Sequence, residues 1–511
     1  MQNRREFIVK TPLGLAGLVA GATWSSRLAI AQAGPVTIAF PADVPNWDPI
    51  SAGSAFSISV FKCVFDKPIN LMSDLSIGPS IVETHRWLDK EGRTLELNLR
   101  AGATFHNGDP VTSEDLKFTF FDRPTADAKL SIAGSWLSRL VGIDTPTPTR
   151  AIFRFKESFA IAPQLLGDGT AYIMPKKYFE KVGRDGFMAA PIGSGPYKLV
   201  DYRRDSRIVL EAYDKYWGGP AQIKRVTFQI MKDTSARIAA IQAGQVDFVS
   251  AIPVREVARL DARPGLVAAA HPITEVVMIQ MINEGVFKDQ NLRLAMHHAI
   301  DKAALSKAFF GDKAEPLSMW AGKGMPANDP GFTFPYSPDL ARALLAKSGY
   351  SPEKPIKIDV LTFNGRFPGD YDVARAIVQM WRRVGIDAAL ETIDPNKYNE
   401  LTRVGKLPAP TLYSWFNSTG DPTIYSGWLM DPTRIFSVWK SDDVMPKLQP
   451  LLNELDYSKR MAGYRAFDRW IVEQGYALPL LQGTTTVVHS ERVKYKAFRN
   501  GWVLPYYWTA G

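Results

Sequence analysis

The sequence lacks the features that mark several classes of protein. It contains one cysteine in 511 residues, Cys63, so no intramolecular disulfide can form and stability must come from a buried core. Its most apolar stretch, residues 13–24, is interrupted by Gly14, Gly17 and Gly21 and is shorter than the ~20 residues of a membrane-spanning helix. Although the net charge is +9, no run of five basic residues occurs. The charge pattern therefore argues against a nucleic-acid partner.

Metal ligands and cofactor motifs are equally scarce. Two of the six histidines, His297 and His298, are adjacent, so on a helix they point about 100° apart and cannot chelate one ion. The other four are scattered, no Cys/His spacing exists, and no glycine-rich phosphate loop is present. We therefore expect no metal and no cofactor.

Catalytic motifs are weak as well. Residues 193–195, Gly-Ser-Gly, lack the spacing of a nucleophile elbow. Ser59 and Lys62, with residues 347–349 (Lys-Ser-Gly), resemble the paired motifs of a serine acyl transferase or hydrolase. The second motif should lie on a strand, yet residues 341–347 have a helical pattern that Gly349 ends. We expect no enzyme, and keep this acyl transferase as the alternative of a different class.

The N-terminus has the pattern of an export signal. Arg4 and Arg5 precede a glycine- and alanine-rich stretch, an arrangement that resembles the twin-arginine class. Small residues then recur up to Ala31 and Ala33, where a signal peptidase would cut. The sequence predicts a signal over residues 1–33, and no cysteine for a lipid anchor lies at the cleavage site.

Periodicity in the rest of the chain predicts an α/β protein. Residues 226–249 and 356–390 each follow a strand, helix, strand pattern, and residues 291–310 between them favour one amphipathic helix. Upstream, alternating residues around 95–99 and a hairpin over 197–213 indicate a strand-rich region. Two α/β lobes joined by crossings of the chain leave a cleft, the usual place for a small ligand.

One segment stands out for its composition. Residues 413–428 hold five aromatic side chains and five serine or threonine side chains around a Gly-Asp-Pro turn. Such a mixture suits the stacking and orientation of a small molecule, but the same aromatics could simply fill a core. The pattern alone leaves both interpretations open.

Several blocks resemble the peptide, nickel and opine solute-binding proteins of ABC importers, solute-binding family 5. They are "PSIVETHRWLDKEGRTLELNLRAGATFHNGDPVTSEDLKFTF" from residue 79, "IGSGPYKLVDY" from 192, "YDKYWGG" from 213, "TSARIAAIQAGQVDFV" from 234, "VFKDQNLRLAMHHAIDKAAL" from 286 and "SPDLARALLAKSGY" from 337. The resemblance implies a bilobal periplasmic-binding-protein fold. Lobe I would comprise residues 34–276 and 479–511, with a strand-rich subdomain at about 70–190, and lobe II residues 277–478.

The resemblance also implies a binding site in the cleft. Trp415 and Phe416 would pack on the ligand, while Asn417, Ser418 and Asp421 would supply hydrogen bonds. Residues Arg366, Ser54 and Phe56 are further candidates. Peptide binders of the family carry an aspartate three residues after the tryptophan, where it pairs with the ligand's α-ammonium group.

In this sequence that position is Ser418, which cannot neutralise a buried ammonium. We therefore expect modified or amine-blocked peptides, opines or sugar-like solutes, with standard di- and oligopeptides as the alternative. The resemblance further implies a periplasmic monomer that delivers its solute to an ABC permease driven by ATPase subunits.

Overall fold

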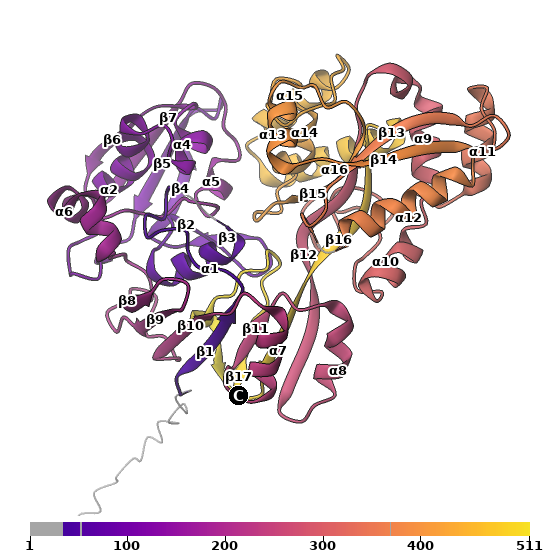
Figure 1. Ribbon diagram of the computed structural model, residues 1–511. Helices are drawn as coiled ribbons and strands as arrows, with labels where there is room; N and C mark the ends of the chain where they lie inside the picture. The colour runs from indigo at the N-terminus through magenta and orange to yellow at the C-terminus, as the bar shows by residue number, and fades with distance from the viewer. Residues whose placement is uncertain (1–33, 52–53, 368) are drawn as a thin grey trace, which may run out of the picture.

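A sheet of ten strands runs through both halves of the molecule (Figure 1). The computed structural model describes residues 34–51, 54–367 and 369–511, so the predicted signal lies outside the described residues. In spatial order the strands are β14 (Ile386–Thr392), β13 (Ile356–Thr362), β15 (Thr411–Phe416), β12 (Leu266–Gln280), β16 (Ala477–Ser490), β11 (Phe248–Ser250), β1 (Val36–Phe40), β10 (Arg225–Ile230), β9 (Arg207–Ala212) and β8 (Tyr197–Arg203).

Strands β12 and β16 pass from one half to the other as a long antiparallel pair (Figure 1). Their register shifts between Pro272 and Val276, so the ladder is irregular where the halves meet. The predicted lobe boundaries, 276/277 and 478/479, both fall within these two strands. The division into lobes stays a prediction, and the terms first half and second half are used here for residues 34–276 with 479–511 and for residues 277–478. The crossing strands are where a hinge would lie.

Both predicted strand-helix-strand units are confirmed. In the first half, β1 pairs in parallel with β10 and β11, which flank it, and α7 (Thr234–Gln242) connects those two. The helix begins as the sequence indicates, because the Asp233 carboxylate accepts a hydrogen bond from the Ala236 amide at 2.7 Å. In the second half, β13 and β14 pair in parallel through α12 (Asp370–Arg382). The predicted hairpin is β8 and β9.

The helix predicted over residues 291–310 is wrong in one respect, because the chain forms two helices there. They are α9 (Gln290–His298) and α10 (Lys302–Phe310). The Asp301 side chain accepts a hydrogen bond from the Ala304 amide at 2.8 Å and so begins a new helix. The apolar spacing continues across the break, which is why periodicity alone predicted one element.

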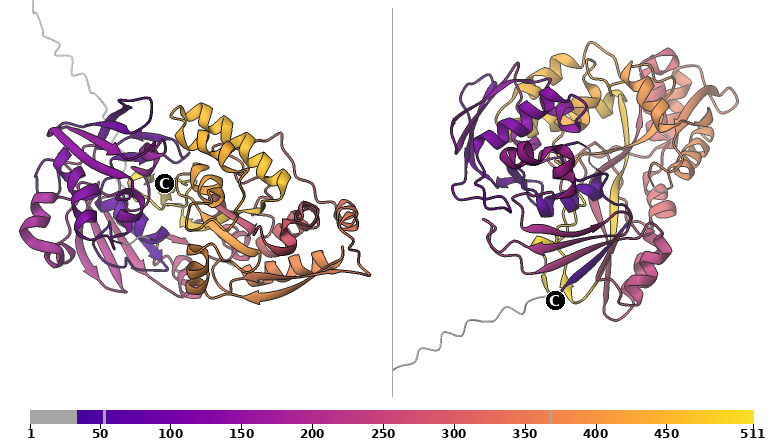
Figure 2. Two further views of the ribbon diagram at one scale, coloured as in Figure 1. Left: turned by 90° about the horizontal axis from the view of Figure 1, so that it is seen from above. Right: turned by 60° about the vertical axis from the view of Figure 1, so that its left-hand side comes forward.

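A separate sheet forms the strand-rich subdomain. Its strands, in spatial order, are β4 (Val82–Trp87), β5 (Thr94–Leu99), β7 (Arg150–Phe155) and β6 (Leu140–Thr147). Its helices include α2 (Ser113–Lys117), α4 (Ser131–Trp136), α5 (Ala162–Leu165) and α6 (Lys176–Ala189). Seen from above, the subdomain lies beside the second half (Figure 2). That half also holds α11 (Pro338–Lys347), α13 (Pro395–Arg403), α15 (Met445–Asn453) and α16 (Tyr457–Gln474).

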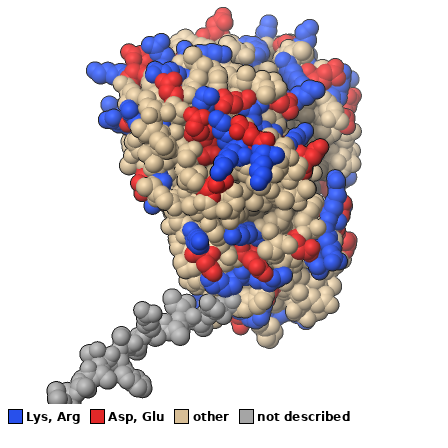
Figure 3. All heavy atoms as spheres, turned by 90° about the vertical axis from the view of Figure 1, so that its left-hand side faces the viewer, with Lys and Arg blue, Asp and Glu red and all other residues tan. Residues whose placement is uncertain are grey.

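The two halves have separate hydrophobic cores. One is built from residues of the second half, and the other from the first half and its subdomain. Trp415 packs against both cores, which places it where the halves meet. Among the described residues, no helix is long and apolar enough to span a membrane. On the face in Figure 3, basic and acidic side chains are interspersed rather than gathered into a stripe of one sign.

Candidate functional site

The predicted binding loop leaves the end of β15 beside the irregular part of the β12–β16 ladder, where Phe416 pairs with Glu275. Asn417 shapes the turn, because its side-chain oxygen accepts hydrogen bonds from the amides of Thr419 and Gly420, both at 3.1 Å. Gly420 has φ +68°, and a Cβ there would come within 2.5 Å of the Leu75 side chain. The loop is thus held tightly against the first half.

A buried ion pair fixes the far end of the loop. The Asp421 carboxylate lies 2.8 Å from the Arg460 guanidinium, and the two side chains are 1% and 2% exposed. Arg460 also donates to the carbonyl of Ala160 in the subdomain, at 3.1 Å. Of the predicted ligand-binding residues, Asn417 and Asp421 therefore have their polar groups engaged by the protein itself.

Ser418 is held between the two halves. Its hydroxyl donates to the carboxylate of Asp168, which follows α5 in the first half. Its backbone carbonyl accepts from the side-chain amide of Asn500 at 3.2 Å. The second carboxylate oxygen of Asp168 has no hydrogen bond to any described residue, and the side chain is half-buried. Beside it, burial holds the pKa of the Lys67 ammonium well below its usual value, while Asp168 opposes this shift. An acidic side chain thus stands next to Ser418.

The predicted aromatic and basic residues meet around Tyr413. The Trp415 ring is 6.0 Å from the Tyr413 ring and 5.8 Å from the Phe436 ring, while Phe416 is 36% exposed. Arg366 donates to the Tyr413 hydroxyl at 2.7 Å, and its guanidinium stacks 4.2 Å from the ring. Tyr413 itself belongs to the core, so both interpretations of the aromatic segment apply, each to different residues.

Glu275 adds an acidic group at the same place. Burial raises the pKa of its carboxyl, and Ser414 and Arg366 partly oppose the shift. A Cβ on Gly483 in β16 would lie 2.7 Å from the Cβ of Glu275, so glycine is needed where the strands approach.

Two predicted residues lie apart from the loop, at the start of α1 (Ala55–Val64). The Ser54 side chain accepts from the Ser57 amide at 3.2 Å and caps the helix. The Phe56 ring packs 5.6 Å from Phe40. Both are engaged within the first half.

The geometry of Ser59 and Lys62 does not favour an acyl transferase. Ser59 is 1% exposed, and its hydroxyl oxygen accepts from the Val503 amide at 3.0 Å. The Lys62 ammonium donates to Asn70 at 2.9 Å, and burial lowers its pKa to about 8. A nucleophile must be reached by substrate, and this serine is enclosed.

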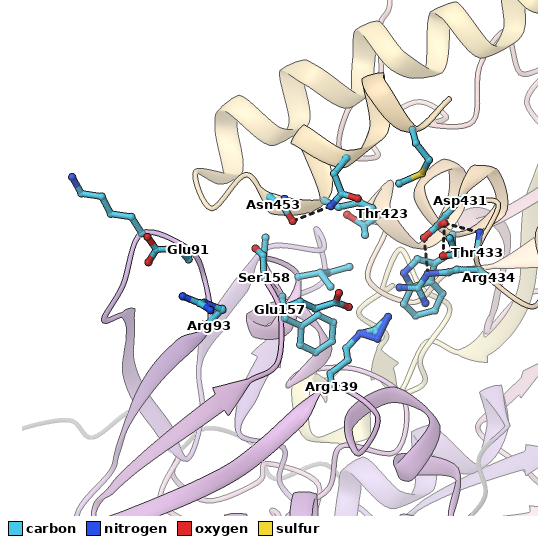
Figure 4. Close-up of a pocket in the computed structure, with 18 residues that line it drawn as sticks. Glu91, Arg93, Arg139, Glu157, Ser158, Thr423, Asp431, Thr433, Arg434 and Asn453 are labelled. Carbon is cyan, nitrogen blue, oxygen red and sulfur yellow. Dashed lines mark hydrogen bonds and ion pairs between the residues drawn. The ribbon is translucent and has the colours of Figure 1, made fainter. Parts of the chain in front are cut away.

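A cavity of about 570 Å³, here called the outer cavity, lies between the subdomain and the second half (Figure 4). Its volume is within the range of small-molecule sites. Arg139 and Glu157 reach into it from the subdomain, and Arg434 from the second half. Its lining comprises Lys90, Glu91, Arg93, Arg139, Glu157, Ser158, Phe159, Ala160, Ile161, Thr423, Trp428, Asp431, Thr433, Arg434, Met445, Gln449, Leu452 and Asn453.

Sequence reasoning missed Asp168, Glu275 and the charged residues of the outer cavity. Asp168 lies 250 residues before Ser418, and Arg139 and Arg434 are separated by a similar stretch. None belongs to a motif of recognisable spacing. Only the composition of residues 413–428 and the family resemblance pointed to this region.

Comparisons with known proteins agree with this architecture. The family model "Bacterial extracellular solute-binding proteins, family 5 Middle" matches residues 76–437. The chain is 25% identical over 471 residues to a dipeptide-binding protein of Escherichia coli K12, covering 84% of this chain and 86% of the relative. It is 22% identical over 494 residues to an Escherichia coli glutathione-binding protein, covering 92% of each.

A solved structure supports the fold. The structure of HbpA2 from Haemophilus parasuis superimposes with a TM-score of 0.85 at 18% identity, covering 93% of this chain and all of the other. Solved neighbours include bilobal periplasmic binding proteins, among them the unliganded open form of a murein tripeptide-binding protein with a TM-score of 0.79. With the family model matching well over half of its residues, the chain belongs to the bacterial extracellular solute-binding proteins, family 5.

Proposed function

We propose that this chain is the substrate-binding component of an ABC importer, which captures a small polar solute between its halves and delivers it to a permease. The observation that carries the proposal is the outer cavity, whose walls come from both halves of the molecule. Strands β12 and β16 connect those halves through an irregular ladder. Closing the halves around a solute is the motion that this connection permits, and it would let a permease distinguish loaded from empty protein.

The proposed solute carries an amine and is peptide-like. The carboxylate of Asp168, hydrogen-bonded to Ser418, has one oxygen without a partner among the described residues. It can neutralise a cationic group that Ser418 alone could not. The dipeptide- and glutathione-binding relatives favour the same class. The expectation of an amine-blocked ligand, which rested on Ser418, is thereby weakened, and standard peptides become the leading candidates.

The proposed contacts lie around the loop that follows β15, apart from the lining of the outer cavity. Trp415 and Phe416 supply apolar surface, Arg366 supplies a cation, and Ser418 orients Asp168. Asn417 and Asp421 act by shaping the loop. Ser54 and Phe56 are retained as more distant candidates on the first half.

A thermal-shift screen followed by titration calorimetry tests the proposal. The panel holds dipeptides and tripeptides, their N-acetylated forms, opines and sugars. A ligand at 100 times its Kd adds about 2.7 kcal/mol to the free energy of unfolding. Asp168→Asn should weaken free-amine peptides at least about tenfold, which corresponds to ~1.4 kcal/mol.

The matched control is Asp185→Asn on α6, since Asp185 is exposed and makes no ion pair within the described residues. It should leave peptide affinity unchanged. If N-acetylated peptides bind the unmodified protein as tightly as free ones, the role of Asp168 is wrong. If no solute in the panel shifts the melting temperature, the transport role itself loses its support.

We also propose export through the twin-arginine pathway, cleavage near Ala31 or Ala33, and a monomer in the periplasm. Replacing Arg4 and Arg5 together by lysine should retain the precursor in the cytoplasm, as cell fractionation would reveal. Light scattering of the mature protein tests whether it is a monomer. Normal processing of the lysine variant would exclude this export route.

A further inference from the structure

The outer cavity is lined by two arginines, of which Arg434 makes an ion pair and Arg139 makes none among the described residues. Arg139 lies over the Phe159 ring at 4.8 Å and has no ion pair within 4.0 Å among the described residues. Arg434 lies over the Trp428 ring at 4.6 Å, and its Nε is 3.6 Å from the Asp431 carboxylate. Two guanidinium groups thus face the same space from opposite halves (Figure 4).

Arg139 influences the electrostatics of Arg434. Burial lowers the pKa of Arg434 to about 10, and Arg139 contributes to the shift, which Asp431 and Glu157 oppose. Burial also lowers the pKa of Arg139, and the Glu157 and Asp431 carboxylates oppose this shift. Two like charges near each other in a partly desolvated cavity are stabilised by an anion placed between them.

Three other polar groups at the cavity have no hydrogen-bond or ion-pair partner among the described residues. The Glu157 carboxylate makes no hydrogen bond or ion pair with any described residue. The Ser158 hydroxyl and the Trp428 indole N–H are buried and have no hydrogen-bond partner in the part of the chain that the structure describes. Because those two atoms are buried beneath the cavity surface, the exposed Glu157 carboxylate is the one of these three groups that a solute can reach.

We propose that the outer cavity binds the amino-acid end of a small zwitterionic solute. The carboxylate lies between Arg139 and Arg434, and the ammonium group pairs with Glu157. Glu157 also disfavours a second carboxylate, so a zwitterion is preferred over a dicarboxylate.

The apolar part of the wall indicates the rest of the solute. Phe159, Met445 and Leu452 line the cavity and suit an aliphatic side chain. Because Arg139 belongs to the subdomain and Arg434 to the second half, one bound carboxylate ties the halves together. The Glu157 pairing is a separate site from the pairing of an amine with Asp168, which does not line the outer cavity, so the proposal rests on the proposed function only in taking this solute as a transported one.

The test uses L-leucine as the probe, with L-leucinamide, which lacks the carboxylate, and N-acetyl-L-leucine, which lacks the ammonium group. Binding to the mature protein is followed by calorimetry and by tryptophan fluorescence, since Trp428 lines the cavity. Leucine should bind saturably, and each blocked compound should bind at least about tenfold more weakly.

The variants Arg139→Gln, Arg434→Gln and Glu157→Gln should each weaken leucine about tenfold or more. Arg255→Gln is the matched control, because its side chain is 82% exposed and far along the chain from the cavity residues. Circular dichroism and melting temperature establish that each variant is folded.

The outcomes separate the two proposals. Absence of saturable leucine binding, equal binding of leucinamide, or unchanged affinity in both arginine variants would overturn this proposal. If peptides nevertheless bind in a manner that depends on Asp168, the proposed function stands alone. If leucine binds as expected but neither it nor any peptide is imported by cells carrying the protein, the site stands and the transport role fails.

Discussion

Replacing Asp421 by asparagine leaves the Arg460 guanidinium, 2% exposed, without its carboxylate. Arg460 would keep its bonds to the carbonyls of Ala160 and Glu454, at 3.1 and 3.2 Å, which carry no full negative charge. Removing one partner of a buried ion pair typically costs about 3–5 kcal/mol, because the other charge stays desolvated. At about 2–4 °C per kcal/mol, the melting temperature should fall by about 6–20 °C, toward the lower end for a chain of this size.

Calorimetry and urea unfolding of Asp421→Asn measure this loss, with Asp185→Asn as the control. The double variant Asp421→Leu/Arg460→Met should recover most of it, because replacing a buried pair by apolar groups is often neutral. A drop of less than 2 °C, together with a clear loss of solute affinity, would refute the reasoning. Asp421 would then be a ligand contact, as the family resemblance first implied.

Three further predictions concern other positions. Burial raises the pKa of Asp468 to about 7, so folding favours its protonated form and the free energy of unfolding should fall as pH rises from about 4 to 7. Asp468→Asn should remove that slope in urea titrations at pH 5 and 8. Gly483→Ala should lose about 1–3 kcal/mol against Glu275, whereas Gly134→Ala, with open space around it, should lose nothing. A fluorophosphonate probe should leave Ser59 unlabelled by mass spectrometry, and an adduct there would revive the acyl transferase.

The elements predicted well from the sequence are those whose signals are local. The units over 226–249 and 356–390 combine alternating strands with a capped helix and a glycine stop, so each local choice agrees with the fold. The helix over 291–310 was wrong because one capping aspartate, Asp301, outweighed a continuous apolar spacing. A helix cap depends on one residue, whereas the apolar period is judged over a window of many residues and does not register a single cap.

The candidate site was predictable only in part. The aromatic composition of residues 413–428 drew attention to the right segment, yet it could not separate Tyr425, fully buried in the core, from the half-buried Trp415. That difference depends on which neighbours cover each ring. The outer cavity was out of reach for the same reason, since Arg139 and Arg434 converge only through tertiary structure.

Ser418 provides the last and sharpest case. Its lack of charge argued against an amine, but the structure brings the Asp168 carboxylate to its hydroxyl from 250 residues away. An aspartate added at 418 would therefore lie against a second carboxylate, and the repulsion would raise the pKa of one of them. Ser418→Asp should weaken amine-bearing peptides or leave them unchanged, while Ser418→Asp/Asp168→Ser, which moves the acid to the other side of the contact, should restore binding in calorimetry. If the single variant instead binds tighter than the unmodified protein, Asp168 is not the acid that receives the amine.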